Sequence, residues 1–257
     1  MKPVISIIIP VYNSAETLPC TLDSVLTQNY QDFEIIIVDD GSTDNSKAVC
    51  EEYMARSSKV HCISIPNGGP GNARNVGLEH ASGGWITFID SDDLIEQDYL
   101  SIQINSNAEL QIQNWAVFGG AEMKYEHLEK GYINDSDINV FLEENMHKDI
   151  FRMVSCKFYK KSIIDGNRIR FMPEFRMGED TLFMLDYLKY VRTICVLDSG
   201  KYLYFRPSDW NGKYNIGIDN ALLYIGAFYD RYTNLPYTCW RLLYFMTGWY
   251  PNVIENF

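Results

Sequence analysis

The sequence lacks the features that mark several large classes of protein. It has no run of about 18 apolar residues, the length that a membrane-spanning helix needs. Basic residues are outnumbered, since 22 Lys and Arg against 34 Asp and Glu leave a net charge of -12. That charge argues against a nucleic-acid partner and against electrostatic capture by anionic lipid. With 46% hydrophobic residues the chain can still bury a core, so it is not a disordered protein.

Cysteine and histidine are sparse and scattered. The six cysteines form no Cys-x-x-Cys pair, a pattern typical of reduced, buried thiols in a cytosolic protein. The four histidines lie far apart, so a zinc site built from clustered ligands is not expected. The first residues run directly into an apolar strand, and no signal peptide is expected. These observations predict a cytoplasmic protein.

What the sequence does contain is a regular alternation of apolar runs and helical patterns over its first 100 residues. Short loops between alternating strands and helices indicate right-handed βαβ units and a mostly parallel sheet. The fold class is therefore α/β and Rossmann-like, with the first 100 residues as its nucleotide-binding half. The predicted strands cover 4–9, 34–38, 60–65 and 85–89, and the predicted helices cover 14–26, 43–56 and 72–81.

The second half of the chain is less regular. Residues 131–149 are polar and acidic, and predict a loop with at most one short helix at 138–144. The C-terminal pattern at 218–249 is helical and rich in Tyr, Phe and Trp. The remaining predictions are strands at 110–119, 154–159, 193–197 and 202–205 and a helix from Asp180 or Thr181 to 189.

Three carboxylates lie in the run Asp90-Ser91-Asp92-Asp93, directly after the strand expected at 85–89. Carboxylates crowded at a strand end repel each other unless a cation or strong donors lie among them. A divalent ion that bridges phosphates is typically bound by one or two carboxylates, and open α/β sheets bind ligands beyond the carboxyl ends of their strands. The alternative interpretation is a helix N-cap with acidic first-turn residues before 94–100.

Two adjacent aspartates, Asp39 and Asp40, end the strand expected at 34–38 and precede Gly41 and Ser42. A carboxylate at this position can accept a hydrogen bond from a uracil N–H or hold a ribose hydroxyl. The alternative is a strand-to-helix turn in which Asp and Ser act as caps. A cap accounts for one or two polar residues, but it does not account for two aspartates before the glycine.

A glycine-rich segment, 67–75, follows the third predicted strand. Glycines let a backbone approach a ligand closely, and the N-terminus of the next helix favours anions. The spacing is a broken dinucleotide fingerprint, because Arg74 replaces the third glycine, so a dehydrogenase is not favoured. No Gly-Lys-Ser/Thr follows, so the segment is not a P-loop. Arg74 is either a contact to a diphosphate or base, or a solvated helix residue.

The run Gly178-Glu179-Asp180-Thr181 precedes another helical pattern. An acidic pair at a helix start usually acts as a cap and as a partner of the helix dipole. With a metal ion and a nucleotide sugar on the same face, a carboxylate here could instead deprotonate an acceptor hydroxyl.

Four ordered motifs together resemble glycosyltransferase family 2, inverting sugar transferases with a GT-A fold, and in particular its bacterial cell-surface polysaccharide type. The similarity covers about residues 2–100 and returns at 157–162 and 178–183. The motifs are Ser6–Asn13, Ile35–Ser46, Gly71–Asn75 and Phe88–Asp93.

The resemblance implies roles for particular residues. Asp92 would bind Mn²⁺ or Mg²⁺, and Asp180 would be the general base, with Glu179 as the alternative. Residues 207–210, after Arg206, depart from the family pattern, and a donor-covering role for Arg206 does not follow. The residues implied in binding a nucleotide sugar are Pro10, Tyr12, Asp40, Asn67, Gly69, Arg74, Asp90 and Ser91.

The resemblance also implies an organisation and a reaction. Residues 1–210 would form the GT-A catalytic domain, with 1–100 as nucleotide-binding half and 101–210 as acceptor half, and 211–257 a helical extension. The expected donor is a UDP-sugar, and the expected acceptor is a glycan or lipid-linked glycan. The extension is open to four interpretations: an amphipathic cap on the core, a cover for the acceptor, a homodimer contact, or a peripheral contact with the cytoplasmic face of a membrane.

Two other functions compete with this one. A GT-A module could hold a nucleotide sugar inside a glycan-assembly complex without transferring it. A nucleotidyltransferase would require a Gly-rich loop with Lys or Arg after the first strand, and residues 10–14 lack one. The sequence leaves open which sugar is moved and to which acceptor.

Overall fold

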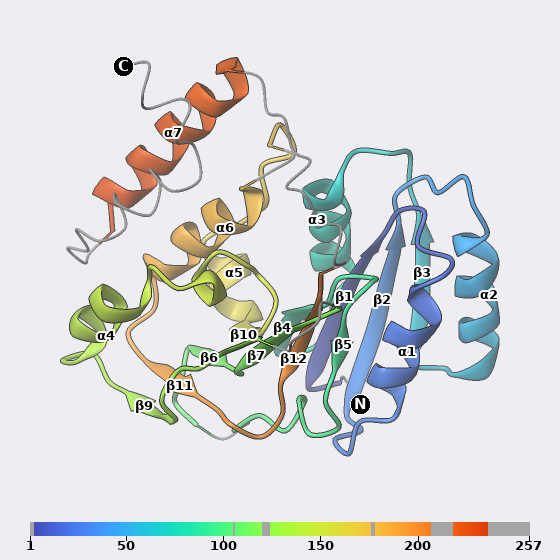
Figure 1. Cartoon of the computed structure of the whole chain (residues 1–257), viewed down its shortest axis with the longest axis horizontal. Coiled ribbons are helices and arrows are strands. Elements are labelled where there is room, and N and C mark those ends of the chain that lie inside the picture. Colours follow the sequence, from blue (N-terminus) through green and yellow to red (C-terminus); the bar gives the residue numbers. More distant parts are fainter. Residues whose placement is uncertain (1–2, 105, 120–123, 176–177, 207–217, 236–257) are drawn as a thin grey trace.

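The computed structural model describes residues 3–104, 106–119, 124–175, 178–206 and 218–235 (Figure 1). Sequence-based expectations for 207–217 and 236–257, including the end of the helical extension, lie outside these residues. An eight-stranded sheet with the order β3-β2-β1-β4-β10-β6-β11-β9 forms its centre, beside a four-stranded sheet with the order β5-β12-β7-β8.

The N-terminal strands confirm the predicted parallel sheet. β1 (Ile5–Val11) lies between β2 (Phe33–Asp39) and β4 (Trp85–Phe88), and β3 (Val60–Ser64) lies beyond β2. All three pairings are parallel. β1 is a near-continuous apolar run because both of its faces are covered, and its isoleucines are fully buried.

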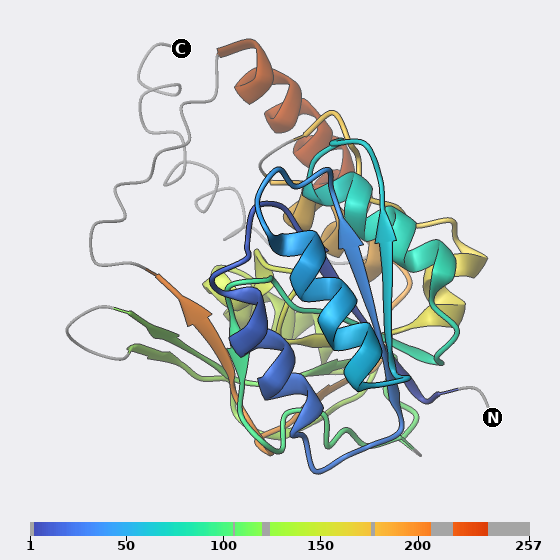
Figure 2. The same cartoon turned by 90° about the vertical axis from the view of Figure 1, so that its right-hand side faces the viewer.

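The helices of this half lie on both faces of the sheet. α1 (Leu18–Leu26) and α2 (Ser46–Arg56) connect β1 to β2 and β2 to β3, whereas α3 (Pro70–His80) leads back across β1 to β4. Because such crossovers are right-handed, the reversal of strand order at β1 places α3 on the face opposite α1 and α2 (Figures 1 and 2). A reversal of this kind opens a crevice at the carboxyl ends of the strands.

The second half extends the large sheet and builds the small one. β10 (Lys157–Lys160) pairs antiparallel with β4 and with β6 (Leu110–Ile112), and β11 (Ile194–Val196) lies between β6 and β9 (Gly131–Ile133). The small sheet contains β5 (Leu94–Ile95), β12 (Tyr202–Phe205), β7 (Trp115–Phe118) and β8 (Lys124–Glu126). The other described helices are α4 (Ile138–Asn145), the 3-10 helix η1 (Asp149–Phe151), α5 (Lys161–Gly166), α6 (Glu179–Leu188) and α7 (Ile218–Thr233).

The prediction of one strand at 110–119 is wrong, since the chain leaves one sheet and enters the other at Gln113 and Asn114. Both side chains are buried and bind loops instead of continuing the strand. The Gln113 amide donates to the Tyr99 carbonyl at 2.9 Å, and Asn114 accepts from the Leu128 N–H at 2.8 Å. An alternating pattern does not reveal such a crossing, because both strands keep the period of two.

Several predicted boundaries also move. The strand expected from 154 begins only at Lys157, because Cys156 has a positive φ of 65°. The loop expected at 131–149 contains β9 before its helix. α2 begins at Ser46 rather than at residue 43, because Asn13 Oδ1 accepts from the N–H groups of Thr43 and Asp44.

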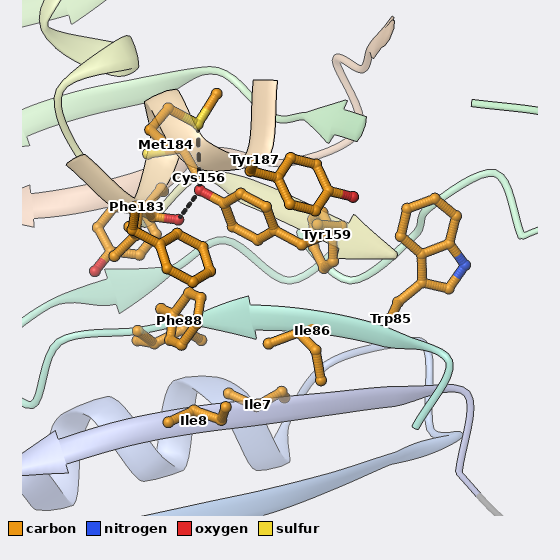
Figure 3. Close-up of a cluster of buried hydrophobic side chains, with 14 of the residues drawn as sticks. Ile7, Ile8, Trp85, Ile86, Phe88, Cys156, Tyr159, Phe183, Met184 and Tyr187 are labelled. Atoms are coloured by element: carbon orange, nitrogen blue, oxygen red, sulfur yellow. Dashed lines mark hydrogen bonds between the residues drawn. The ribbon is translucent and has the colours of Figure 1, made fainter. Parts of the chain in front are cut away.

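The core joins α6 to the large sheet. Figure 3 shows the rings of Phe88 on β4, Tyr159 on β10 and Phe183 on α6 meeting edge to face. The ring centroids of Phe88 and Phe183 are 5.7 Å apart, and those of Tyr159 and Phe183 are 5.6 Å apart. Aromatic pairs in this geometry contribute about 0.5–1.5 kcal/mol beyond the area that they bury. The start of α6 is therefore held in a fixed position relative to the end of β4.

The five cysteines within the described residues are free thiols, and Cys239 lies outside those residues. Within those same ranges, the structure contains no helix that is both long enough and apolar enough to span a bilayer.

Candidate active site

A pocket of about 490 Å³ lies at the carboxyl ends of the four parallel strands. Its walls come from the last residues of β1 and from the segments that follow β1, β2, β3 and β4, as the crevice rule for α/β sheets predicts. The side chain of Tyr12 is about half exposed there. The lining residues are Pro10, Val11, Tyr12, Ser14, Asp40, Asn67, Gly69, Pro70, Arg74, Asp90, Ser91 and Asp92.

Side-chain hydrogen bonds connect the loops around this pocket. Asn13 has a φ of 51°, a conformation that asparagine tolerates better than most residues, and its Oδ1 accepts from the Thr43 N–H at 2.8 Å. Ser14 and Ser91 share a hydrogen bond of 2.7 Å between their hydroxyl groups. The segments after β1, β2 and β4 are thereby held together across the mouth of the pocket.

Asp40 shapes the glycine-rich loop. Its two carboxylate oxygens accept from the N–H groups of Gly68 and Gly69, each at 2.8 Å. The Asn67 amide donates to the Asp40 carbonyl at 2.9 Å. Asp39 acts locally, since its Oδ1 accepts from the Ser42 N–H. A single cap does not account for these two aspartates, because each organises a different segment of backbone.

Arg74 lies at the centre of a buried cluster of carboxylates. The side chain is only 5% exposed, and Nη1 donates to Asp180 Oδ1 at 2.9 Å and to Glu179 Oε1 at 3.2 Å. Nη2 donates to Asp90 Oδ1 at 2.8 Å. The interpretation of Arg74 as a solvated helix residue is therefore wrong. Its guanidinium ties the end of β4 to the start of α6.

The same cluster sets the protonation of Asp180. Burial raises the pKa of Asp180 to about 7, Arg74 acts against that rise, and the charges of Glu179 and Asp90 add to it. Conversely, the surrounding carboxylates raise the pKa of Arg74 despite its burial, so the guanidinium stays charged. A carboxyl group with a pKa near neutrality can exchange a proton under physiological conditions.

Residues 6–166 match the family model described as Glycosyl transferase family 2. The chain belongs to this family. Glycosyltransferase GlyA of Streptococcus pneumoniae is 36% identical over 188 residues, which are 68% of this chain and 27% of GlyA. An uncharacterized glycosyltransferase of Haemophilus influenzae is 36% identical over 197 residues, which are 74% of each chain. This family 2 chain thus spans about a quarter of one relative and three quarters of the other.

Solved structures support the fold. The crystal structure of Staphylococcus aureus TarS 1–349 in complex with UDP matches with a TM-score of 0.74 at 20% identity, covering 99% of this chain and 72% of that chain. This likeness shows that the family 2 chain has the GT-A fold, as its motifs indicated.

The site residues expected from the family 2 motifs come together in the structure. Asp180 and Glu179 do not line the pocket, but Arg74 connects both to it. Those that line the pocket are Pro10, Tyr12, Asp40, Asn67, Gly69, Arg74, Asp90, Ser91 and Asp92.

Asp92 offers a carboxylate to a hard cation at the pocket. Its side chain is accessible at the pocket, and partial burial together with the charge of Asp90 raises its pKa to about 6. Within the described residues, no three side chains of His, Cys, Asp or Glu form a ligand cluster. A phosphate-bridging Mg²⁺ or Mn²⁺ does not need one, because one or two carboxylates, phosphate oxygens and water complete its coordination. The residues present therefore fit such an ion.

Asp93 is a residue whose role sequence reasoning missed. It is fully buried, and its Oδ2 accepts from the Tyr202 hydroxyl at 2.5 Å while Oδ1 accepts from the Phe205 N–H at 2.7 Å. The Tyr202 oxygen also accepts from the Asp90 N–H at 3.1 Å. The third aspartate of the motif therefore anchors the loop to β12. No local pattern could reveal this, because Tyr202 lies 109 residues away.

Lys157 is a second residue whose role was missed. It is fully buried, and its Nζ donates to the carbonyls of Ile150, Met153 and Ser155. These bonds close the segment 150–155, whose Val154 N–H reaches Asp180 Oδ2 at 3.4 Å. A lysine at the start of a strand normally predicts a solvated end, so only the tertiary structure reveals this role.

Proposed function

We propose that this chain transfers a sugar from a nucleoside diphosphate sugar, with UDP as the expected nucleotide, to a hydroxyl of a glycan or lipid-linked glycan, with inversion of the anomeric carbon. One observation carries the proposal. Arg74 joins Asp90, at the strand-end pocket, to Asp180, at the start of α6. A donor in the pocket would therefore lie next to a carboxylate that can take a proton.

The pocket offers suitable contacts to each part of a donor. The exposed Tyr12 ring and the loop that Asp40 holds through Gly68 and Gly69 would border the nucleobase. Asp90 and Ser91 would lie against the ribose or the donor sugar. The TarS structure with UDP supports the choice of nucleotide by similarity of fold.

The proposed donor site includes a divalent cation. Asp92 would hold Mn²⁺ or Mg²⁺, which when bound neutralises charge on a diphosphate leaving group. Because Asp92 and Asp90 add two negative charges to the pocket, a diphosphate would be repelled without such an ion.

The reaction itself would use Asp180. Its carboxylate takes the proton of the acceptor hydroxyl, and the oxygen attacks the anomeric carbon from the face opposite the nucleotide. The bond from that carbon to the diphosphate breaks, and UDP leaves with the electron pair. Arg74 orients the Asp180 carboxylate and favours its charged form. Attack from the opposite face inverts the anomeric centre, as in inverting hydrolysis.

A thermal-shift panel of UDP-, GDP- and dTDP-sugars with and without Mn²⁺ tests the donor. We expect the UDP-sugars to raise the Tm, and only when Mn²⁺ is present. Asp92→Asn should abolish this shift, whereas Asp98→Asn, at an exposed position in the same segment, should retain it. A metal-independent shift, or a preference for GDP-sugars, would correct the proposed donor.

Release of UDP from UDP-sugars, with glycan and lipid-linked acceptors supplied, tests transfer. Turnover that requires both acceptor and Asp180 supports an enzyme. Binding of UDP-sugar without turnover on any acceptor class would instead support a non-catalytic module that holds the donor for another protein.

A further inference from the structure

We propose that Tyr224 of α7 is a positioning residue for Asp180, so that α7 belongs to the transfer machinery and not to a separable extension. The inference rests on the proposed function and deepens it. It concerns how the carboxylate is held in place, and it assigns a role to a helix that the family match at 6–166 does not reach.

The contact between the two elements occurs at Gly178. This residue is the N-cap of α6, two positions before Asp180, and its φ of 83° is in the left-handed region. A Cβ atom built on Gly178 would lie 2.2 Å from Cε2 and 2.6 Å from Cζ of the Tyr224 ring. Real Cβ contacts do not reach such distances. The ring therefore presses on the bare backbone of the turn from which α6 begins.

The rest of α7 keeps Tyr224 in this place. Tyr224, Phe228 and Arg231 are spaced i, i+4 and i+7, so they share one helix face. The ring centroids of Tyr224 and Phe175 are 6.0 Å apart, and Phe228 is only 1% exposed. The contact with Phe175 and the burial of Phe228 thus hold the helix face that carries Tyr224 against the core.

Arg231 sets the register of the two helices. Its Nε donates to Asp186 Oδ2 at 2.8 Å, within α6. Tyr224 thus lies beside Gly178, and Arg231, seven residues later, lies beside Asp186. The helices α6 and α7 therefore run side by side in the same direction (Figure 1). Such a parallel arrangement fixes how far along α6 the Tyr224 ring falls.

The remaining contacts of Asp180 lie elsewhere around it. Arg74 holds Oδ1 at 2.9 Å, and the Val154 N–H approaches Oδ2 at 3.4 Å. The Leu182 N–H donates to the Gly178 carbonyl at 3.1 Å, which begins the helix. Tyr224 instead packs against the turn at Gly178. Removal of its ring would let Gly178 shift, and the Asp180 carboxylate, two residues later, would shift with it. A displacement of about 1 Å can cost a factor of about 100 in rate.

The donor pocket meets this contact only through the Arg74 side chain, which Asp180 and Glu179 hold. Among the residues that the structure describes, none that line the pocket belongs to α6 or α7. Loss of the Tyr224 ring should therefore lower kcat without changing the affinity for UDP. A general loss of structure would change both.

The experiment measures kcat, the KM for UDP-sugar and the Tm for full-length variants. Tyr224→Ala should lower kcat by about 10- to 100-fold, with the donor KM within about twofold of the wild-type value. Tyr224→Phe, which keeps the ring, should have a kcat close to that of the wild type. Leu223→Ala, on the exposed face of the same helix, should behave as wild type. Tyr224→Leu serves the same comparison should Tyr224→Ala fail to fold.

A double-mutant cycle tests the contact directly. Gly178→Ala strains a left-handed backbone position and also brings a methyl group against the ring, so it should lower kcat. In the Gly178→Ala background, adding Tyr224→Ala should cost less than it does alone, because the clash is gone while the backbone strain is the same in both. Additive effects, an unchanged kcat in both Tyr224→Ala and Tyr224→Leu, or a parallel rise in donor KM would overturn the inference. Absence of transfer in the wild type would overturn the proposed function instead, so the two failures are distinguishable.

Discussion

The Arg74 guanidinium and the Asp180 carboxylate are joined by a hydrogen bond of 2.9 Å across 106 residues of sequence. Arg74 belongs to the helix that follows the glycine-rich loop, and Asp180 belongs to the first turn of α6. The bond joins the N-terminal half of the fold, which contains the pocket, to the half proposed to receive the acceptor. Four predictions depend on it or on the loops around it.

The pH dependence of transfer should report Asp180. Its pKa is raised to about 7, mainly by burial, and a general base acts only when unprotonated. The rate should therefore rise about tenfold per pH unit below that value and level off above it. Initial rates at saturating donor between pH 5 and 9 measure this. A rate that stays flat down to pH 5 would exclude Asp180 as the titrating base.

Removing the Arg74 charge should move this profile. In Arg74→Met the Asp180 carboxylate loses the interaction that lowers its pKa, so the acid limb should shift to higher pH. Because three carboxylates also lose their partner, stability should fall by about 3–5 kcal/mol, as for other broken buried ion pairs. Arg74→Lys should give a pH profile and a stability between those of the wild type and Arg74→Met. Arg56→Gln, which changes an exposed arginine, should alter neither the pH profile nor the stability. An unshifted limb in a folded Arg74→Met protein would refute the electrostatic role.

The two candidate bases can be separated by amide substitutions. Asp180→Asn should lower kcat by a factor of about 100 to 10,000 while UDP affinity is retained. Glu179→Gln should have the smaller effect, because Glu179 is only 7% exposed and its Oε1 is directed at Arg74. Kinetics and UDP titration on the same preparations make the comparison. The reverse ranking would assign the base to Glu179.

The anchor between Asp93 and β12 predicts a change in stability. Tyr202→Phe removes the hydroxyl that donates to Asp93 and accepts from the Asp90 N–H, leaving buried polar groups without a partner. The expected cost is about 1–3 kcal/mol. Urea unfolding should show it, and Tyr125→Phe, at an exposed position, should show no change. Equal midpoints for the two variants would mean that the bond does not stabilise the fold.

The pocket at the strand ends could be predicted from sequence because its residues lie next to the strands that position them. Tyr12, Asp40 and Asp92 each follow an apolar run, and parallel strands bring such ends to one edge of the sheet. The family 2 motifs then distinguish this sheet from other Rossmann-like folds. Local pattern and tertiary position agree in this half of the chain.

The other half could not be predicted in the same way, because its contacts join residues distant in sequence. The partners of Arg74, the anchor of Asp93 and the burial of Lys157 all depend on how β10, α6 and β12 pack. Gln113 and Asn114 move the chain between sheets without disturbing its alternation. Charged residues such as Arg74, Asp93 and Lys157 are as typical of a solvated surface as of a buried contact, so their sequence context does not reveal their burial.

The most direct measurement is a crystal structure of the chain with UDP and Mn²⁺. We expect the nucleotide at the carboxyl ends of β1 to β4, with its base beside Tyr12 and the Asp40 loop and the metal ion bound by Asp92. UDP bound elsewhere on the chain, or in this pocket with its diphosphate directed away from Asp92 and Asp180, would contradict it.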